Sequence, residues 1–121
     1  MSISLGILIS GNGTNLQALI DACSDDNFPA NIAIVISNNF NAYGLKRAAK
    51  ANIPTEVVNQ NKFVNREQYD NELAEILEGA GVELVCLAGF MNVLSKTFVG
   101  RWKNRIINVH PSLLPAFKGL N

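Results

Sequence analysis

The chain contains a single histidine among its 121 residues, in the segment NVHPSLLP at positions 108–115. Asn108 precedes His110 by two positions, at the end of an apolar run that reads as a strand. Side chains two positions apart in a strand project from the same face. An amide that stabilises an oxyanion, beside an imidazole that carries a proton, suits a reaction that develops an oxyanion and moves a proton. An isolated histidine can equally be structural, and the pattern alone leaves both interpretations open.

A second candidate site is the segment SGNGTNLQ, residues 10–17, which follows an apolar run and opens a helical pattern. Backbone N–H groups and the helix dipole there could hold an anion such as phosphate, and glycine lets the backbone come close. The segment lacks the Lys-Ser/Thr pair of a P-loop and the third glycine of the dinucleotide fingerprint. No acidic residue follows the next apolar run, at positions 37–39, which disfavours NAD. A tight turn without a ligand is the alternative.

The segment AGFMNVL, residues 88–94, has two interpretations as well. It can be the end of a buried strand, or Met91–Leu94 can line a flat apolar pocket whose backbone groups bond a heterocycle. Arg66, in the first turn of a predicted helix, is by default a solvated residue that can pair with Asp70 at i+4.

Strands and helices alternate along the chain, which predicts a doubly wound α/β fold with a mostly parallel sheet and flanking helices. Apolar runs predict strands at residues 3–9, 32–37, 54–58, 83–90 and 105–110. Helical patterns begin at residue 14 or 15, at 43, at 65 and near 95, and Thr14 or Asn15 can cap the first helix. Asn65 with Gln68 three residues on resembles a capping box, and Gly79 or Gly81 can end the helix that begins there. Ligands bind such sheets beyond the carboxyl ends of the strands. The three candidate segments all follow or end strands, so we expect them to lie at this edge.

The composition disfavours some classes of binding partner. Ten basic and ten acidic residues give a formal net charge of zero, so the sequence gives no sign of the basic surface that nucleic-acid binding needs. Its apolar runs are too short to cross a bilayer, and its N-terminus reads as a strand and not as a signal peptide. The two cysteines have no metal-ligand spacing and are typical of buried thiols in a reducing, cytoplasmic compartment. We therefore expect small-molecule partners.

Several segments together resemble the glycinamide ribonucleotide formyltransferases of purine biosynthesis: ISGNGTNLQALIDA, SNNFNAYGLKRA, REQYDNELAEIL, LAGFMNVLS and NVHPSLLPAFKGLN. NVHPSLLP and LAGFM resemble segments of the wider formyltransferase family. SGNGTNLQ is the segment that resembles the glycinamide ribonucleotide enzymes in particular. The resemblance implies a formyltransferase Rossmann-like fold. It also implies that the chain uses 10-formyltetrahydrofolate as co-substrate and formylates the amine of 5-phosphoribosylglycinamide, on the route to IMP, without a metal.

The resemblance further implies roles for individual residues. The substrate phosphate would be held by Gly13, Thr14 and Asn15. The folate would be held by Arg66, Met91, Asn92, Val93, Leu94 and Asn108. Asn92 departs from the arginine often found there in relatives, which affects a side-chain contact and not a pocket built from backbone. Asn108 would stabilise the tetrahedral oxyanion, and His110 would act as general acid.

We expect residues 1–121 to form one domain, the N-terminal part of a formyltransferase domain of roughly 200 residues. An apolar sheet edge after residues 105–110 is a poor place to stop, so the natural polypeptide is expected to continue. The aspartate that raises the pKa of the catalytic histidine in the family would lie downstream, so this chain alone should be inactive. The alternatives are a formyltetrahydrofolate deformylase and a non-catalytic nucleotide- or folate-binding fragment. A monomer and a homodimer are both compatible with the sequence.

Overall fold

A computed structural model describes residues 2–109 of the chain, so His110 and the segment after it lie outside the described residues. The strands are β1 (Ile3–Ile9), β2 (Ala30–Ser37), β3 (Thr55–Val57), β4 (Leu84–Leu87) and β5 (Ile106–Asn108). The helices are α1 (Thr14–Cys23), α2 (Tyr43–Lys50), α3 (Arg66–Gly79) and α4 (Lys96–Arg101), with a short 3-10 helix, η1, at Gln60–Lys62. Each predicted strand and helix is present, with ends within a few residues of those expected.

The five strands form one sheet in the order β3-β2-β1-β4-β5, and every neighbouring pair is parallel. β1 lies at the centre, where Ile7 is paired with Val35 of β2 and with Cys86 of β4. The chain builds the sheet outward from β1 to β3, then returns to the other side of β1 to add β4 and β5. The predicted doubly wound fold is confirmed, and its strand order reverses between β1 and β4.

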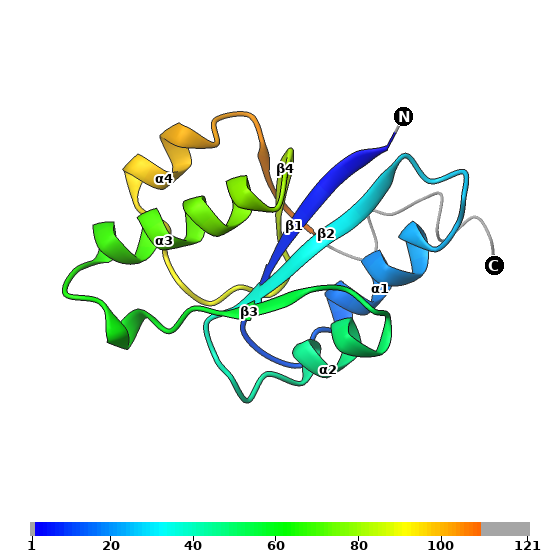
Figure 1. Ribbon diagram of the computed structural model, residues 1–121, viewed down its shortest axis with the longest axis horizontal. Helices are drawn as coiled ribbons and strands as arrows, with labels where there is room; N and C mark the ends of the chain where they lie inside the picture. The colour runs from blue at the N-terminus through cyan, green and yellow to red at the C-terminus, as the bar shows by residue number, and fades with distance from the viewer. Residues whose placement is uncertain (1, 110–121) are drawn as a thin grey trace.

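Helices cover both faces of the sheet, as Figure 1 shows, with α1 and α2 on one face and α3 and α4 on the other. Alternate residues of β1 enter the two cores: Leu8 packs with the residues of α3 and α4, whereas Ile7 and Ile9 pack with those of α1 and α2. Because β1 is buried on both faces, its sequence is apolar throughout and does not alternate. No helix among residues 2–109 is long and apolar enough to cross a membrane.

α3 has the ends that its sequence predicts. The Asn65 side chain accepts a hydrogen bond from the Gln68 N–H at 2.9 Å, while Gln68 reaches back to the N–H of Val64. At the other end, Gly81 has a φ of +74°, and the Val82 N–H donates to the carbonyl of Leu77 at 3.0 Å. A left-handed glycine with this bond is a common way to end a helix.

Gly6 lets β1 pass directly beneath the end of α3. A Cβ atom at this position would lie 2.5 Å from Leu77 Cδ2 and 2.8 Å from Val82 Cγ2. Leu77 and Val82 are both buried, so neither side chain can move into solvent to make room. The absence of a side chain at Gly6 therefore sets the distance between the central strand and the helix that leads to the candidate site.

We predict that Gly6→Ala lowers the free energy of unfolding by about 1–3 kcal/mol, because it overpacks a filled core. Gly79→Ala is the matched control, since an added Cβ there meets nothing within 4 Å. It should change stability by less than about 1 kcal/mol. Urea denaturation of the two variants measures both values, and equal stabilities would show that β1 and α3 are not tightly packed at Gly6.

Candidate functional site

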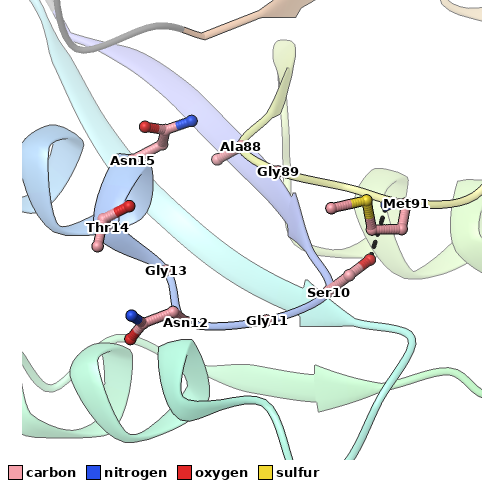
Figure 2. Close-up of a pocket in the computed structure, with 9 residues that line it drawn as sticks. All are labelled: Ser10, Gly11, Asn12, Gly13, Thr14, Asn15, Ala88, Gly89 and Met91. Atoms are coloured by element: carbon pink, nitrogen blue, oxygen red, sulfur yellow. Dashed lines mark hydrogen bonds between the residues drawn. The ribbon is translucent and has the colours of Figure 1, made fainter.

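A pocket of about 380 Å³ lies where the strand order reverses, beyond the carboxyl ends of β1 and β4. In a doubly wound sheet this is the position at which ligands bind. The pocket is lined by the turn that joins β1 to α1 and by the segment that follows β4, as Figure 2 shows. The lining residues are Ser10, Gly11, Asn12, Gly13, Thr14, Asn15, Ala88, Gly89 and Met91. The predicted phosphate residues are all among them.

The N-terminus of α1 lies at this pocket without a side-chain cap. Gly13 is the N-cap residue, with a φ of +80°, and no side chain among the described residues caps the helix. The prediction that Thr14 or Asn15 caps α1 is therefore wrong, because the left-handed turn at Gly13 starts the helix one residue earlier. The first helical bond runs from the Gln17 N–H to the Gly13 carbonyl at 2.8 Å. The N–H groups of the first turn therefore have no acceptor within the helix, an arrangement that can bind an anion.

α2 packs against the turn that joins β1 to α1. Gly13 approaches Gly44 so closely that a Cβ on Gly13 would lie 2.7 Å from the Gly44 Cα. The Gly44 N–H donates to the carbonyl of Gly11 at 3.0 Å. Arg47 donates from Nε to the Asn12 carbonyl at 2.8 Å and from Nη2 to the Asn12 side-chain oxygen at 3.1 Å. The turn is held in one conformation by backbone and side chain together.

Two long-range hydrogen bonds connect the turn to the other candidate segments. The Met91 N–H donates to Ser10 Oγ at 2.8 Å, drawn as a dashed line in Figure 2. Asn15 Nδ2 donates to the carbonyl of Val109 at 3.2 Å. Asn15 thus uses one hydrogen of its side-chain amide within the protein. The second bond also ties α1 to the end of β5, next to Asn108.

The structure separates the two interpretations of residues 91–94. Met91 and Val93 are 82% and 73% exposed, so the interpretation of the segment as buried core is wrong for both. Leu94 is half-buried against the core formed with α3 and α4, and it anchors the segment. Large apolar side chains that face outward beside a pocket are typical of a ligand-binding surface.

α3 contacts this segment from the side. Arg66 is exposed, donates to the carbonyl of Val93 and forms no ion pair with Asp70 within residues 2–109, so it does not make the i+4 pair that its spacing allows. Asp70 instead accepts from the Ser95 N–H at 2.9 Å. Asn92 Nδ2 donates to the Tyr69 hydroxyl at 3.2 Å. Burial chiefly raises the pKa of Tyr69, which keeps its hydroxyl protonated at neutral pH.

Asn108 is the last residue of β5, is paired with Leu87 and has an exposed side chain. Its predicted partner, His110, lies outside the described residues.

The thiols are poor nucleophiles, because burial raises the pKa of Cys86 to about 12 and that of Cys23 to about 11. Among residues 2–109, no group of three His, Cys, Asp or Glu side chains could hold a metal.

Sequence reasoning missed four residues that support the site: Ser10, Arg47, Tyr69 and Asp70. Ser10 and Arg47 act across separations of 81 and 35 residues, which no local pattern reveals. Tyr69 and Asp70 had a usable signal, since they follow Arg66 at i+3 and i+4 and so share its face of α3.

Residues 4–121 of the chain match the family described as Formyl transferase. The chain belongs to this family. The formyl transferase chain is 54% identical, over 119 residues, to the trifunctional purine biosynthetic protein adenosine-3 of Drosophila pseudoobscura pseudoobscura, covering 97% of this chain and 9% of that protein. It is 47% identical, over 117 residues, to the phosphoribosylglycinamide formyltransferase of Haemophilus influenzae, covering 97% of this chain and 55% of that enzyme.

Solved structures agree with the sequence relatives. The crystal structure of phosphoribosylglycinamide formyltransferase from Brucella melitensis has a TM-score of 0.88 at 39% identity, with 99% of this chain and 62% of that chain covered. Glycinamide ribonucleotide transformylase 1 from Symbiobacterium toebii has a TM-score of 0.86 at 45% identity, with 95% and 54% covered. The formyl transferase chain spans little more than half the length of the single-function relatives that it matches.

We predict that Gly13→Ala lowers the free energy of unfolding by about 1–3 kcal/mol, because alanine is strained at this φ and its Cβ meets the backbone of Gly44. Gly11→Ala is the control in the same turn, since a Cβ there meets nothing within 4 Å. Thermal unfolding of both variants is the measurement. Equal melting temperatures would contradict the close approach of α2 to the turn.

Proposed function

We propose that the full-length protein transfers the formyl group of 10-formyltetrahydrofolate to the amine of 5-phosphoribosylglycinamide, a step of de novo purine synthesis. The observation that carries the proposal is the pocket between the uncapped start of α1 and the segment after β4. It offers an anion-binding turn and an outward-facing apolar segment side by side. The relatives named phosphoribosylglycinamide formyltransferase support this choice of substrates.

Each end of the pocket suits one substrate. The substrate phosphate binds the backbone N–H groups of Gly13, Thr14 and Asn15, where the helix dipole favours negative charge. The folate binds along Met91–Leu94, with its heterocycle against the exposed apolar side chains and its polar edge on the backbone. Arg66 donates to Val93 and has further guanidinium N–H groups to offer the folate.

The chemistry takes place between these two ends. The substrate amine attacks the formyl carbon, and the carbonyl oxygen becomes an oxyanion that Asn108 stabilises with its side-chain amide. The oxyanion then re-forms the carbonyl of the new amide as the bond from the formyl carbon to the folate nitrogen breaks. His110 donates the proton that this nitrogen takes up, the attacking amine releases a proton to solvent, and His110 regains its proton from solvent. No metal takes part in these steps. We assign the aspartate that keeps His110 protonated to a part of the protein after residue 121.

The decisive assay measures formyl transfer by the full-length protein with and without 5-phosphoribosylglycinamide. Consumption of 10-formyltetrahydrofolate only in the presence of the acceptor supports the proposal. Release of formate without the acceptor would favour a deformylase instead. We place the enzyme in the cytoplasm, as a monomer or homodimer with small-molecule partners and no nucleic acid or membrane.

A fragment assay separates an enzyme from a binding module. On the proposed function, residues 1–121 alone are inactive, and a complementary C-terminal fragment restores turnover. Ligand binding by residues 1–121 without turnover after complementation would instead indicate a non-catalytic nucleotide- or folate-binding module.

We predict that Asn108→Ala lowers kcat of the full-length enzyme about 10²–10³-fold, since it removes an oxyanion donor. His110→Ala should lower it about 10²–10⁴-fold through loss of the general acid. Stability should hardly change for Asn108→Ala, because this side chain is exposed. The control is Asn71→Ala on the exposed face of α3, which should keep full activity. A variant that loses activity only in proportion to its unfolded fraction would contradict the catalytic assignment.

A further inference from the structure

One face of α3 forms hydrogen bonds with residues 91–95, a segment without regular secondary structure. Arg66, Tyr69 and Asp70 are spaced i, i+3 and i+4 and therefore share this face. Arg66 donates to the carbonyl of Val93. The Tyr69 hydroxyl accepts from Asn92, and Asp70 accepts from the N–H of Ser95. The conformation of the segment is therefore set by the helix beside it.

The two ends of the segment are anchored independently of its middle. At one end the Met91 N–H donates to Ser10 Oγ, and at the other the Ser95 N–H donates to Asp70 Oδ2. Ser95 also caps α4 by accepting from the Phe98 N–H at 3.1 Å. The residues in between depend on their own contacts with α3, and the side chain of Asn92 makes one of these.

Tyr69 is a rigid partner for Asn92. Its side chain is only 2% exposed, and its ring packs edge-on against Phe63 with 5.8 Å between ring centroids. A buried ring in such contacts fixes the position of its hydroxyl, which lies 3.2 Å from Asn92 Nδ2. The polar side chain of the segment thus turns toward the protein, while its apolar neighbours Met91 and Val93 face outward.

We infer that Tyr69 and Asn92 are a positioning pair for the folate pocket. Their hydrogen bond holds the backbone around residues 92–94 in the conformation that receives the heterocycle, and the Asn92 side chain does not itself bind the folate. The inference rests on the proposed function, because it takes the 91–94 segment as the folate site. In this arrangement the side chain at position 92 supports the segment, and the backbone makes the contact with the folate.

The test is a double-mutant cycle on the full-length protein with Tyr69→Phe, Asn92→Ala and the double variant. Each single variant should raise the KM for 10-formyltetrahydrofolate about 2- to 10-fold, the loss expected for one hydrogen bond. The KM for 5-phosphoribosylglycinamide should stay near wild type, and the melting temperature should fall by only about a few degrees, the effect expected for one hydrogen bond. The double variant should be no worse than the worse single variant, because both changes remove the same bond.

Tyr43→Phe is the matched control, since Tyr43 is half exposed on α2 and its hydroxyl bonds to no residue that the structure describes. It should leave both KM values unchanged. Effects that multiply in the double variant would show that Asn92 contacts the folate directly and would overturn the inference. Unchanged KM values, or a lowered melting temperature alone, would overturn it too. A separate binding measurement of tetrahydrofolate to the wild-type protein distinguishes these results from failure of the proposed function, because absence of binding there would refute both.

Discussion

The close approach of two backbone segments, at Gly13 and Gly44, is the constraint on which the candidate site depends. The turn after β1 lies against α2, at a distance that leaves no room for a Cβ on Gly13. The left-handed φ of Gly13 starts α1 without a side-chain cap. The conformation of the turn is therefore maintained from outside the turn, by Gly44 and by the two hydrogen bonds from Arg47 to Asn12.

The parallel sheet brings the remaining parts of the site to this turn. β1 and β4 are neighbours although about 75 residues separate them in the chain, and the segments beyond their carboxyl ends meet through Ser10 and Met91. Asn15 connects the same turn to the end of β5 beside Asn108. Hydrogen bonds therefore link the turn after β1, the segment after β4 and the end of β5, the strand that ends at Asn108. A displacement of one of them is expected to move the others.

Much of this arrangement was predictable because its causes are local. The apolar run of β1 and the cap at Asn65 are short-range patterns, and they identified the strands, the helices and the start of α3 correctly. The contacts within the site could not be predicted where a side chain bonds to a segment that is distant in the sequence. The spacing allows Arg66 to pair with Asp70. Instead, Arg66 donates to the carbonyl of Val93, and Asp70 accepts from the N–H of Ser95. The cap of α1 was mispredicted for a similar reason, since the turn at Gly13 depends on α2. The position of His110 stays a prediction.

We propose that the turn after β1 binds the phosphate of 5-phosphoribosylglycinamide. Titration of the ¹⁵N-labelled full-length protein with this compound, followed by NMR, tests it directly. The amide signals of Gly13, Thr14 and Asn15 should shift the most, in one saturating transition. Met91, which is connected through Ser10, should show a smaller shift. Saturating binding that leaves the three amides of the turn unchanged, and shifts residues at a different surface, would show that the phosphate binds elsewhere.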